Sequence, residues 1–288
     1  TFLSWLGTLV NAGHAGDQGV RVEEPCNVGY LDYEGSQDMA QRTLNALYRQ
    51  YFEGLSPVYY RRGGRSLTAD AEELRRLGME LDIGWWIVDS ALGALQDDSN
   101  SGDPVARCFT VARSLTRRDG SPAHVSFVCH EQKPSREDAK LTKTPLGSGQ
   151  WWNQARDVFH LVGAIEPDKS LMVGIFHQKS NVRRQLKAMS FKVTFASSEG
   201  DVLNAIRVER SDITLTPDLA DKLPDWRRIA AALKHGALTI GDVAGASGIE
   251  SKRAGDVLRR YKGRYWTQTE DEKWGLLVPS EAPGPQFT

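Results

Sequence analysis

The stretch LDIGWWIVDS, residues 81–90, decides how the rest of the chain can be arranged. It is a short apolar run that ends in an acidic residue, Asp89, and the small residues 90–94 follow it. An apolar run bounded by turn signals predicts a strand buried on both faces, as in a parallel α/β sheet. Ligands of such sheets bind beyond the carboxyl ends of the strands, where Asp89 would lie. A carboxylate at that place either caps the following turn or holds a hydrated Mg²⁺.

Further strands and helices alternate around this central strand. The segments before it predict strands at 28–32 and 58–60 and helices at 37–52 and 69–77. The segments after it predict a helix at 104–118, a strand at 123–129, a short helix at 151–156 and strands at 158–162, 172–177 and 190–195. This order is typical of a parallel α/β core. We expect the strands at 172–177 and 190–195 to extend the edge of the same sheet.

The C-terminal part of the sequence predicts a separate, smaller unit. Residues 1–200 would form the α/β domain, and residues 201–224, which carry few apolar side chains, would form a linker. Within 225–279 the pattern predicts helices at 225–234, 238–245 and 249–261 and a β-hairpin at 265–278. Three helices and a hairpin predict a winged helix-turn-helix domain. Residues 280–288 would be a tail.

Composition limits the class of protein. The 288 residues are 40% hydrophobic and 25% charged, which is ordinary for a globular chain. The formal net charge is -1, so any site for a polyanion must be a local patch of basic residues. No apolar run approaches the length of a transmembrane helix, and no signal peptide is visible. The three cysteines form no paired motif, which argues against zinc and for a reducing compartment. We therefore expect a cytoplasmic protein.

Polar side chains follow three of the predicted strands. They are Glu34, Asp89 and His130. Hydrolysis of a nucleoside triphosphate needs a carboxylate to orient water, a carboxylate to hold Mg²⁺ and a group that senses the γ-phosphate. Each residue alone has a simpler interpretation, since Glu34 could cap a helix and His130 could be an ordinary loop residue. Their combination favours nucleotide hydrolysis.

Four segments occur in the order and at about the spacing seen in RecA-like ATPases. They are YLDYEGS at 30–36, WWIVDSALGAL at 85–95, FVCHEQKPS at 127–135 and PLGSGQWWNQARDVFHL at 145–161. Over about residues 1–195 the chain resembles this class, and within it the AAA family ATPases of plasmid RepA-type hexameric helicases. The resemblance implies a RecA-like P-loop fold, ATP and Mg²⁺ as cofactors, and hydrolysis between adjacent subunits of a hexameric ring.

The resemblance also implies roles for individual residues. Glu34 matches the catalytic base, Asp89 the Mg²⁺ contact, and His130 the γ-phosphate sensor that is coupled to DNA-binding loops. The loop with Lys133 and Lys143 resembles the segment that faces DNA in the central channel. Residues that approach the nucleotide of a neighbouring subunit match Arg156, as an arginine finger, and Lys179, with Arg183 as its runner-up. Arg156 could instead form a surface ion pair with Asp157, and residues 179–184 could be a solvated basic turn.

The glycine-rich phosphate loop of this class, G-x-x-x-x-G-K-[ST], does not occur in the 288 residues. In the family that loop immediately precedes the first helix, so Thr1 would match its final threonine and contact both nucleotide and Mg²⁺. We expect an upstream segment with the first strand and most of the loop, without which the polypeptide would bind ATP poorly. If the protein begins near Thr1, it would be a non-hydrolysing relative.

A local basic patch lies in the predicted third helix of the C-terminal unit and just after it. Between 249 and 264, two acidic residues face six basic ones: Lys252, Arg253, Arg259, Arg260, Lys262 and Arg264. This patch predicts contact with DNA, and protein contact is the alternative. The sequence as a whole favours an ATP-dependent DNA helicase or translocase in plasmid or phage replication. A DNA-binding regulator with a degenerate ATPase scaffold and a filament-forming, RecA-like recombination or repair mediator remain alternatives.

Overall fold

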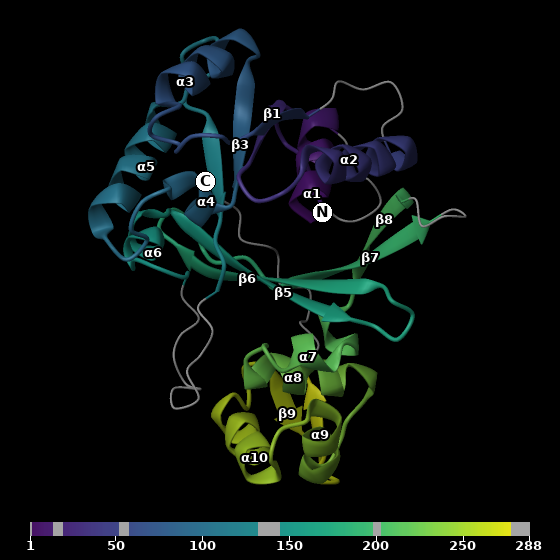
Figure 1. Ribbon diagram of the computed structural model, residues 1–288. Coiled ribbons are helices and arrows are strands. Elements are labelled where there is room, and N and C mark those ends of the chain that lie inside the picture. The colour runs from purple at the N-terminus through teal and green to yellow at the C-terminus, as the bar shows by residue number, and fades with distance from the viewer. Residues whose placement is uncertain (1, 14–19, 52–57, 132–144, 198–202, 278–288) are drawn as a thin grey trace.

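The computed structural model describes residues 2–13, 20–51, 58–131, 145–197 and 203–277 (Figure 1). Its first sheet is parallel and has the order β2-β1-β3-β4, with β1 at Asn27–Asp32, β2 at Tyr59–Arg62, β3 at Ile83–Asp89 and β4 at His124–Val128. The central position of β3 confirms the prediction from residues 81–90. Asp32, Asp89 and Val128 pair across three neighbouring strands, so β1, β3 and β4 end on one row.

Helices cover both faces of this sheet. They are α1 at Phe2–Ala12, α2 at Gln37–Tyr51, α3 at Ala71–Glu80, α4 at Ala91–Leu95 and α5 at Gly102–Ser114. Figure 1 shows α3 and α5 on one side and α1 and α2 on the other. Trp86 and Val88 of β3 point into the core shared with α3 and α5, whereas Trp85 and Ile87 pack with apolar side chains of α1. A strand buried on both faces explains the unbroken apolar run in the sequence.

The second sheet is antiparallel and separate from the first. Its order is β5-β6-β7-β8, with β5 at Asp157–Ile165, β6 at Leu171–Ser180, β7 at Met189–Ser197 and β8 at Leu203–Ser211. The expectation that 172–177 and 190–195 extend the parallel sheet was therefore wrong. One apolar face of the antiparallel sheet, with Val173, Phe191 and Val208, packs against Trp5 and Leu9 of α1 and against α2. This face is covered by helices, as the face of a sheet layer must be.

The stretch 201–224 is not an extended linker within its described part. Residues 203–211 form β8, and η1 at Ile213–Leu215 and α7 at Pro217–Ala220 follow it. Ile206 and Val208 are fully buried and alternate with exposed or partly exposed neighbours, which made this strand look polar in the sequence. Leu219 of α7 packs with Met172 and Phe176 on the opposite face of the second sheet.

The C-terminal unit has its own core. It consists of α8 at Asp225–Ala232, η2 at Leu233–His235, α9 at Ile240–Ser247, α10 at Ser251–Arg260 and a hairpin of β9 at Trp266–Gln268 and β10 at Trp274–Leu276. Trp266 is fully buried, and its indole N–H donates a 2.7 Å hydrogen bond to the carbonyl oxygen of Leu258. The hairpin is thereby tied to α10. None of the helices in the described parts of the chain combines the length and the apolar character needed to cross a bilayer.

Candidate functional site

The carboxyl ends of β1, β3 and β4 bring three predicted site residues close together. Nε2 of His130 lies 3.1 Å from Oε2 and 3.2 Å from Oε1 of Glu34. The hydroxyl of Ser90, the residue after Asp89, donates a hydrogen bond to Oε1 of the same carboxylate. Glu34 and His130 are half exposed, at 45% and 57% of their side-chain surface, while Ser90 is fully buried. The carboxylate of Glu34 is therefore fixed from two sides and still open to water.

The hydrogen bonds to Glu34 stabilise its ionised form. The Ser90 hydroxyl makes the largest contribution, and it lowers the pKa of Glu34 below the ordinary value. Partial burial opposes this shift, and the hydrogen bond and charge of His130 add to it. An ionised carboxylate can orient a water molecule and accept its proton, which is what the predicted base requires.

Asp89 is held by a buried tyrosine. The phenolic O–H of Tyr30, in the neighbouring strand β1, donates a 2.5 Å hydrogen bond to Oδ2 of Asp89. Burial and the negative charge of Asp89 raise the pKa of Tyr30, so the phenol keeps its proton and remains a donor. One carboxylate oxygen of Asp89 is thus fixed by a donor from the neighbouring strand.

Asp32, which the sequence analysis did not single out, supports the turn that carries Glu34. Its Oδ1 accepts hydrogen bonds from the backbone N–H groups of Glu34, at 3.0 Å, and of Gly35, at 2.6 Å. Its Oδ2 accepts a 3.0 Å hydrogen bond from the Tyr60 hydroxyl, and the residue is only 6% exposed. A Cβ atom at position 35 would come within 2.5 Å of Oδ2 of this carboxylate, so a larger residue there would displace the Asp32 side chain. The pattern Asp-x-x-Gly directly after a strand was the available signal for such a turn.

The donor set at the strand ends fits Mg²⁺ rather than a softer metal. It offers the carboxylate of Asp89, whereas the oxygens of Asp32 and Glu34 already accept hydrogen bonds from neighbouring groups. The described residues contain no group of three or more His, Cys, Asp or Glu that could enclose a metal by itself. Mg²⁺ is commonly held by one or two carboxylates, with waters and phosphate oxygens completing its shell. Thr1, the other predicted contact for Mg²⁺ and nucleotide, lies outside the described residues.

A second histidine–carboxylate pair lies beside the first. Oε2 of Glu131 is 3.1 Å from Nε2 of His160 in β5, so consecutive residues after β4 contact different sheets. His130 contacts the end of the parallel sheet through Glu34, and Glu131 contacts the antiparallel sheet. Sequence reasoning missed this pair because its members are 29 positions apart in the chain.

The two residues predicted to act on a neighbouring subunit differ in their surroundings. Arg156 is exposed in the turn between α6, at Gln150–Gln154, and β5, and its guanidinium has no side-chain partner among the described residues. The ammonium of Lys179 donates hydrogen bonds to the carbonyl oxygens at the end of α6, those of Trp152 at 2.7 Å, Asn153 at 3.2 Å and Ala155 at 2.9 Å. Within one chain, Lys179 therefore caps α6. Arg183, its runner-up, is exposed beyond β6.

The predicted DNA-contacting residues are only partly described. Lys133 and Lys143 lie outside the described residues. In the C-terminal unit, Lys252 and Arg260 are exposed on α10, and Arg264 lies on the following turn. Arg253 and Arg259 each pair with a carboxylate, Asp225 at 2.5 Å and Asp256 at 2.8 Å.

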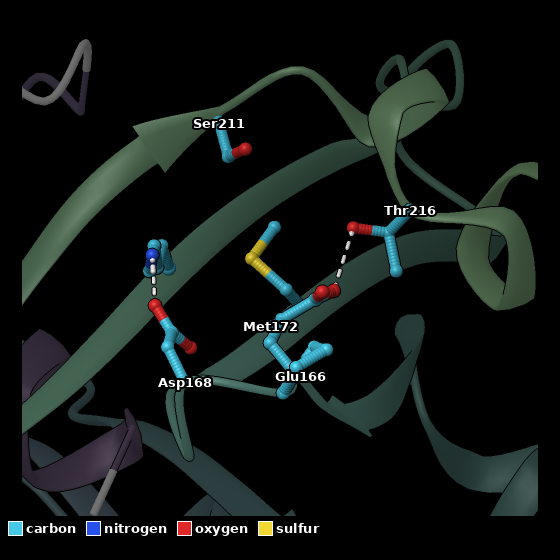
Figure 2. A pocket seen from close by; sticks show the side chains of 7 residues that line it. Glu166, Asp168, Met172, Ser211 and Thr216 are labelled. Atoms are coloured by element: carbon cyan, nitrogen blue, oxygen red, sulfur yellow. Dashed lines mark hydrogen bonds and ion pairs between the residues drawn. The ribbon is translucent and has the colours of Figure 1, made fainter.

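A shallow hollow on the antiparallel sheet lies apart from these residues. Its lining comes from the β5–β6 turn, from β6, β7 and β8, and from the segment after β8. The residues are Glu166, Pro167, Asp168, Met172, Lys192, Ser211 and Thr216. Figure 2 shows Asp168 and Glu166 on one wall, with Thr216 directed toward Glu166. Asp168 is paired with Lys192 at 2.7 Å, which together with the Ser170 hydrogen bonds lowers its pKa. The charges of Asp168 and Lys192 therefore compensate each other.

Comparison with known proteins finds similarity mainly in the region that contains the parallel sheet. Residues 2–136 match the model of a AAA domain family. No curated protein matches the sequence. Among solved structures, a KaiC-like protein from the hyperthermophilic archaeon Pyrococcus horikoshii matches with a TM-score of 0.42 and 13% sequence identity, over 72% of this chain and 83% of that chain. The region from α1 to just beyond β4 is therefore similar to AAA domains, which agrees with the resemblance given above for that part of the chain.

Proposed function

We propose that this chain is the ATP-hydrolysing and DNA-binding part of a ring-forming motor, of the helicase or translocase type that acts in plasmid or phage replication. The observation that carries the proposal is the position of Glu34. Its ionised carboxylate is fixed by Ser90 and His130 at the row of strand ends that also holds Asp89. A AAA domain match over residues 2–136 supports the nucleotide part of the proposal.

The residues divide the work of hydrolysis among them. Bound ATP and Mg²⁺ would supply the phosphoryl group and neutralise its developing charge. Glu34 orients a water molecule and accepts its proton at a carboxylate oxygen. Asp89, held by Tyr30, would hold Mg²⁺. His130 contacts Glu34, so a change at the γ-phosphate would alter this contact and move the segment that follows β4.

The ring and the DNA partner rest on the resemblance and on charge. Arg156 is exposed and its guanidinium has no side-chain partner in the described part of the chain, as a residue that reaches a neighbouring subunit would. The C-terminal unit has three helices and a hairpin in the order of a winged helix-turn-helix domain, and exposed basic residues lie on α10. We propose that this unit is a winged helix that binds DNA.

The test is ATP turnover by the protein expressed from its complete gene, with and without DNA. The variant is Glu34→Gln, and the matched control is Glu72→Gln, which makes the same change on the exposed surface of α3. We expect turnover in the parent and in Glu72→Gln, and loss of turnover with retained ATP binding in Glu34→Gln. Equal turnover in Glu34→Gln would contradict the assigned base. Absence of both ATP binding and turnover in the parent would favour a DNA-binding regulator on a degenerate scaffold.

Electron microscopy of the assembly separates the remaining alternative. Closed rings would support the motor. Filaments on DNA would favour the recombination or repair mediator, for which the same ATPase residues are compatible with a different subunit contact.

A further inference from the structure

The arginines of the C-terminal unit fall into two groups, those paired with carboxylates and those that lie on aromatic rings. Arg253 and Arg259 lie on α10, where a recognition helix would present its cations. Both are engaged with carboxylates of the same unit: Nε of Arg253 is 2.5 Å from Asp225, and a guanidinium nitrogen of Arg259 is 2.8 Å from Asp256. A phosphate would have to compete with these carboxylates, so the pairs reduce the attraction of this face for a polyanion.

Two other arginines lie on aromatic rings instead. Cζ of Arg227, in the first turn of α8, is 5.2 Å from the ring centre of Trp226. Cζ of Arg264, on the turn between α10 and β9, is 5.1 Å from the ring centre of Tyr265. Neither guanidinium has a carboxylate partner within the described ranges. These contacts hold the two cations without neutralising them.

The two rings join these arginines into one surface. Trp226 and Tyr265 stack on each other with centroids 5.1 Å apart and an angle of 13° between the ring planes. Tyr265 also contacts Tyr261 at 5.5 Å and the fully buried Trp266 at 5.8 Å. The stack is thereby anchored in the core of the unit, at the point where α8 meets the start of the hairpin.

The rings of the Trp226–Tyr265 stack are also in contact with Arg227 and Arg264, which limits the kind of ligand that the stack can bind. A base could not insert without displacing them. The guanidinium edges stay available, and a guanidinium that lies on a ring can still donate its N–H groups to a phosphate. Because part of its rotamer freedom is already lost, less entropy is lost when it binds. The surface fits the sugar–phosphate backbone of a nucleic acid rather than its bases.

We propose that Arg227 and Arg264, held on the Trp226–Tyr265 stack, form a phosphate-binding surface for the backbone of duplex DNA, whereas Arg253 joins α10 to α8 through Asp225 and Arg259 pairs with Asp256 on its own helix. This deepens the proposed function, on whose DNA partner it rests, and gives α8 a role that the sequence did not predict. Backbone contacts position a protein on DNA without reading its sequence, so this surface adds affinity in equal measure to all sequences.

The experiment measures binding of the whole chain to a fluorescein-labelled duplex of random sequence by anisotropy, over a series of salt concentrations. The variants are Arg227→Gln, Arg264→Gln and the double variant. Arg259→Gln is the matched control because it removes the same charge from the same unit at a position paired with Asp256. Thermal unfolding of each variant checks that the unit stays folded.

Each phosphate contact contributes about 0.9 to the slope of log affinity against log salt, so we expect the slope to fall by about 0.9 in each single variant and by about 1.8 in the double variant. Arg259→Gln should keep the parental slope. The charge-preserving variants Arg227→Lys and Arg264→Lys should retain it as well, and they guard against a loss caused by local unfolding.

Three outcomes would overturn the proposal. The double variant could bind with the parental slope, or Arg259→Gln could lose as much of the slope as Arg227→Gln. The variants could also lose affinity for a labelled single strand and keep it for the duplex, which would assign the surface to single strands. If the parent binds no DNA while it hydrolyses ATP, the DNA partner of the proposed function is wrong, whichever surface is involved.

Discussion

Nε2 of His130 lies 3.1 Å from Oε2 of Glu34, across the carboxyl ends of two strands that are separated by β3. The pair is formed by residues that follow β1 and β4, and Ser90, which follows β3, completes the contact from the strand between them. The segment after β1 thus carries the carboxylate, and the segments after β3 and β4 each contribute one group that contacts it. The chemistry of Glu34 therefore depends on the alignment of the whole row.

Replacement of Ser90 by alanine should shift the pH dependence of hydrolysis. The Ser90 hydroxyl donates to the ionised form of Glu34 and lowers its pKa, so its removal raises that pKa toward the ordinary value. Below its pKa the carboxyl is protonated and cannot act as a base, and the acidic limb of the ATPase pH profile should move to higher pH. Ser36→Ala, which removes another serine contact at a helix start, is the control. An unchanged acidic limb in Ser90→Ala would contradict the assignment.

Loss of the Tyr30 hydroxyl should destabilise the parallel sheet. Tyr30→Phe leaves the Asp89 carboxylate without its 2.5 Å donor, and an unsatisfied group of this kind costs about 1–3 kcal/mol. Tyr59→Phe is the control, because it makes the same change one strand away, at a residue that only packs against the core. Urea unfolding measures the difference in the free energy of unfolding. Equal free energies of unfolding of the two variants would show that the Tyr30–Asp89 hydrogen bond does not stabilise the fold.

A methyl group at position 29 should not fit. A Cβ at Gly29 of β1 would overlap the indole ring of Trp86 in β3, whereas a Cβ at Gly64 would meet no atom within 4 Å. We expect Gly29→Ala to lower the free energy of unfolding by about 1–3 kcal/mol, as overpacking of a close-packed core does. Gly64→Ala should be nearly neutral, and thermal unfolding of the pair measures both. A neutral Gly29→Ala would mean that Trp86 can shift within its core.

Lys179 should contribute to the stability of each single chain. Its ammonium donates to three carbonyl oxygens at the end of α6, so Lys179→Met should cost about 1–2 kcal/mol. Lys187→Met, in the exposed segment between β6 and β7, is the control. Loss of ATP turnover without loss of stability in Lys179→Met would favour the role in a neighbouring subunit that the resemblance implied.

The local sequence pattern was sufficient to predict the strands of the parallel sheet, but not the arrangement of the antiparallel sheet beside it. The apolar run at 81–90 predicted β3, because a strand that is buried on both faces has apolar residues at consecutive positions. Strands β6 and β7 were predicted as strands, but alternation does not say which sheet a strand joins. In β8, the charged Arg207 and Glu209 alternate with the buried Ile206 and Val208, so a half-buried strand was interpreted as a linker.

The predicted site residues were found by their place after the strands, and their supporting groups were not. Tyr30 reaches Asp89 across two paired strands, and Ser90 reaches Glu34 over a separation of 56 residues. Such contacts depend on strand order, which the sequence did not determine in detail. The pairing of Arg253 with Asp225 was hidden for the same reason, because it joins two helices of the C-terminal unit.

The packing of α1 has a consequence for how the protein is synthesised. Trp5 of α1 lies 5.4 Å from Phe191 of β7, measured between ring centres, and the same core contains Val208 of β8. During synthesis, nearly two hundred further residues must therefore be translated before β7 and β8 can cover the apolar side of α1. Contacts this distant along the chain form slowly and leave apolar surface open to aggregation. The newborn α1 should thus be a binding site for chaperones until β7 and β8 have left the exit tunnel.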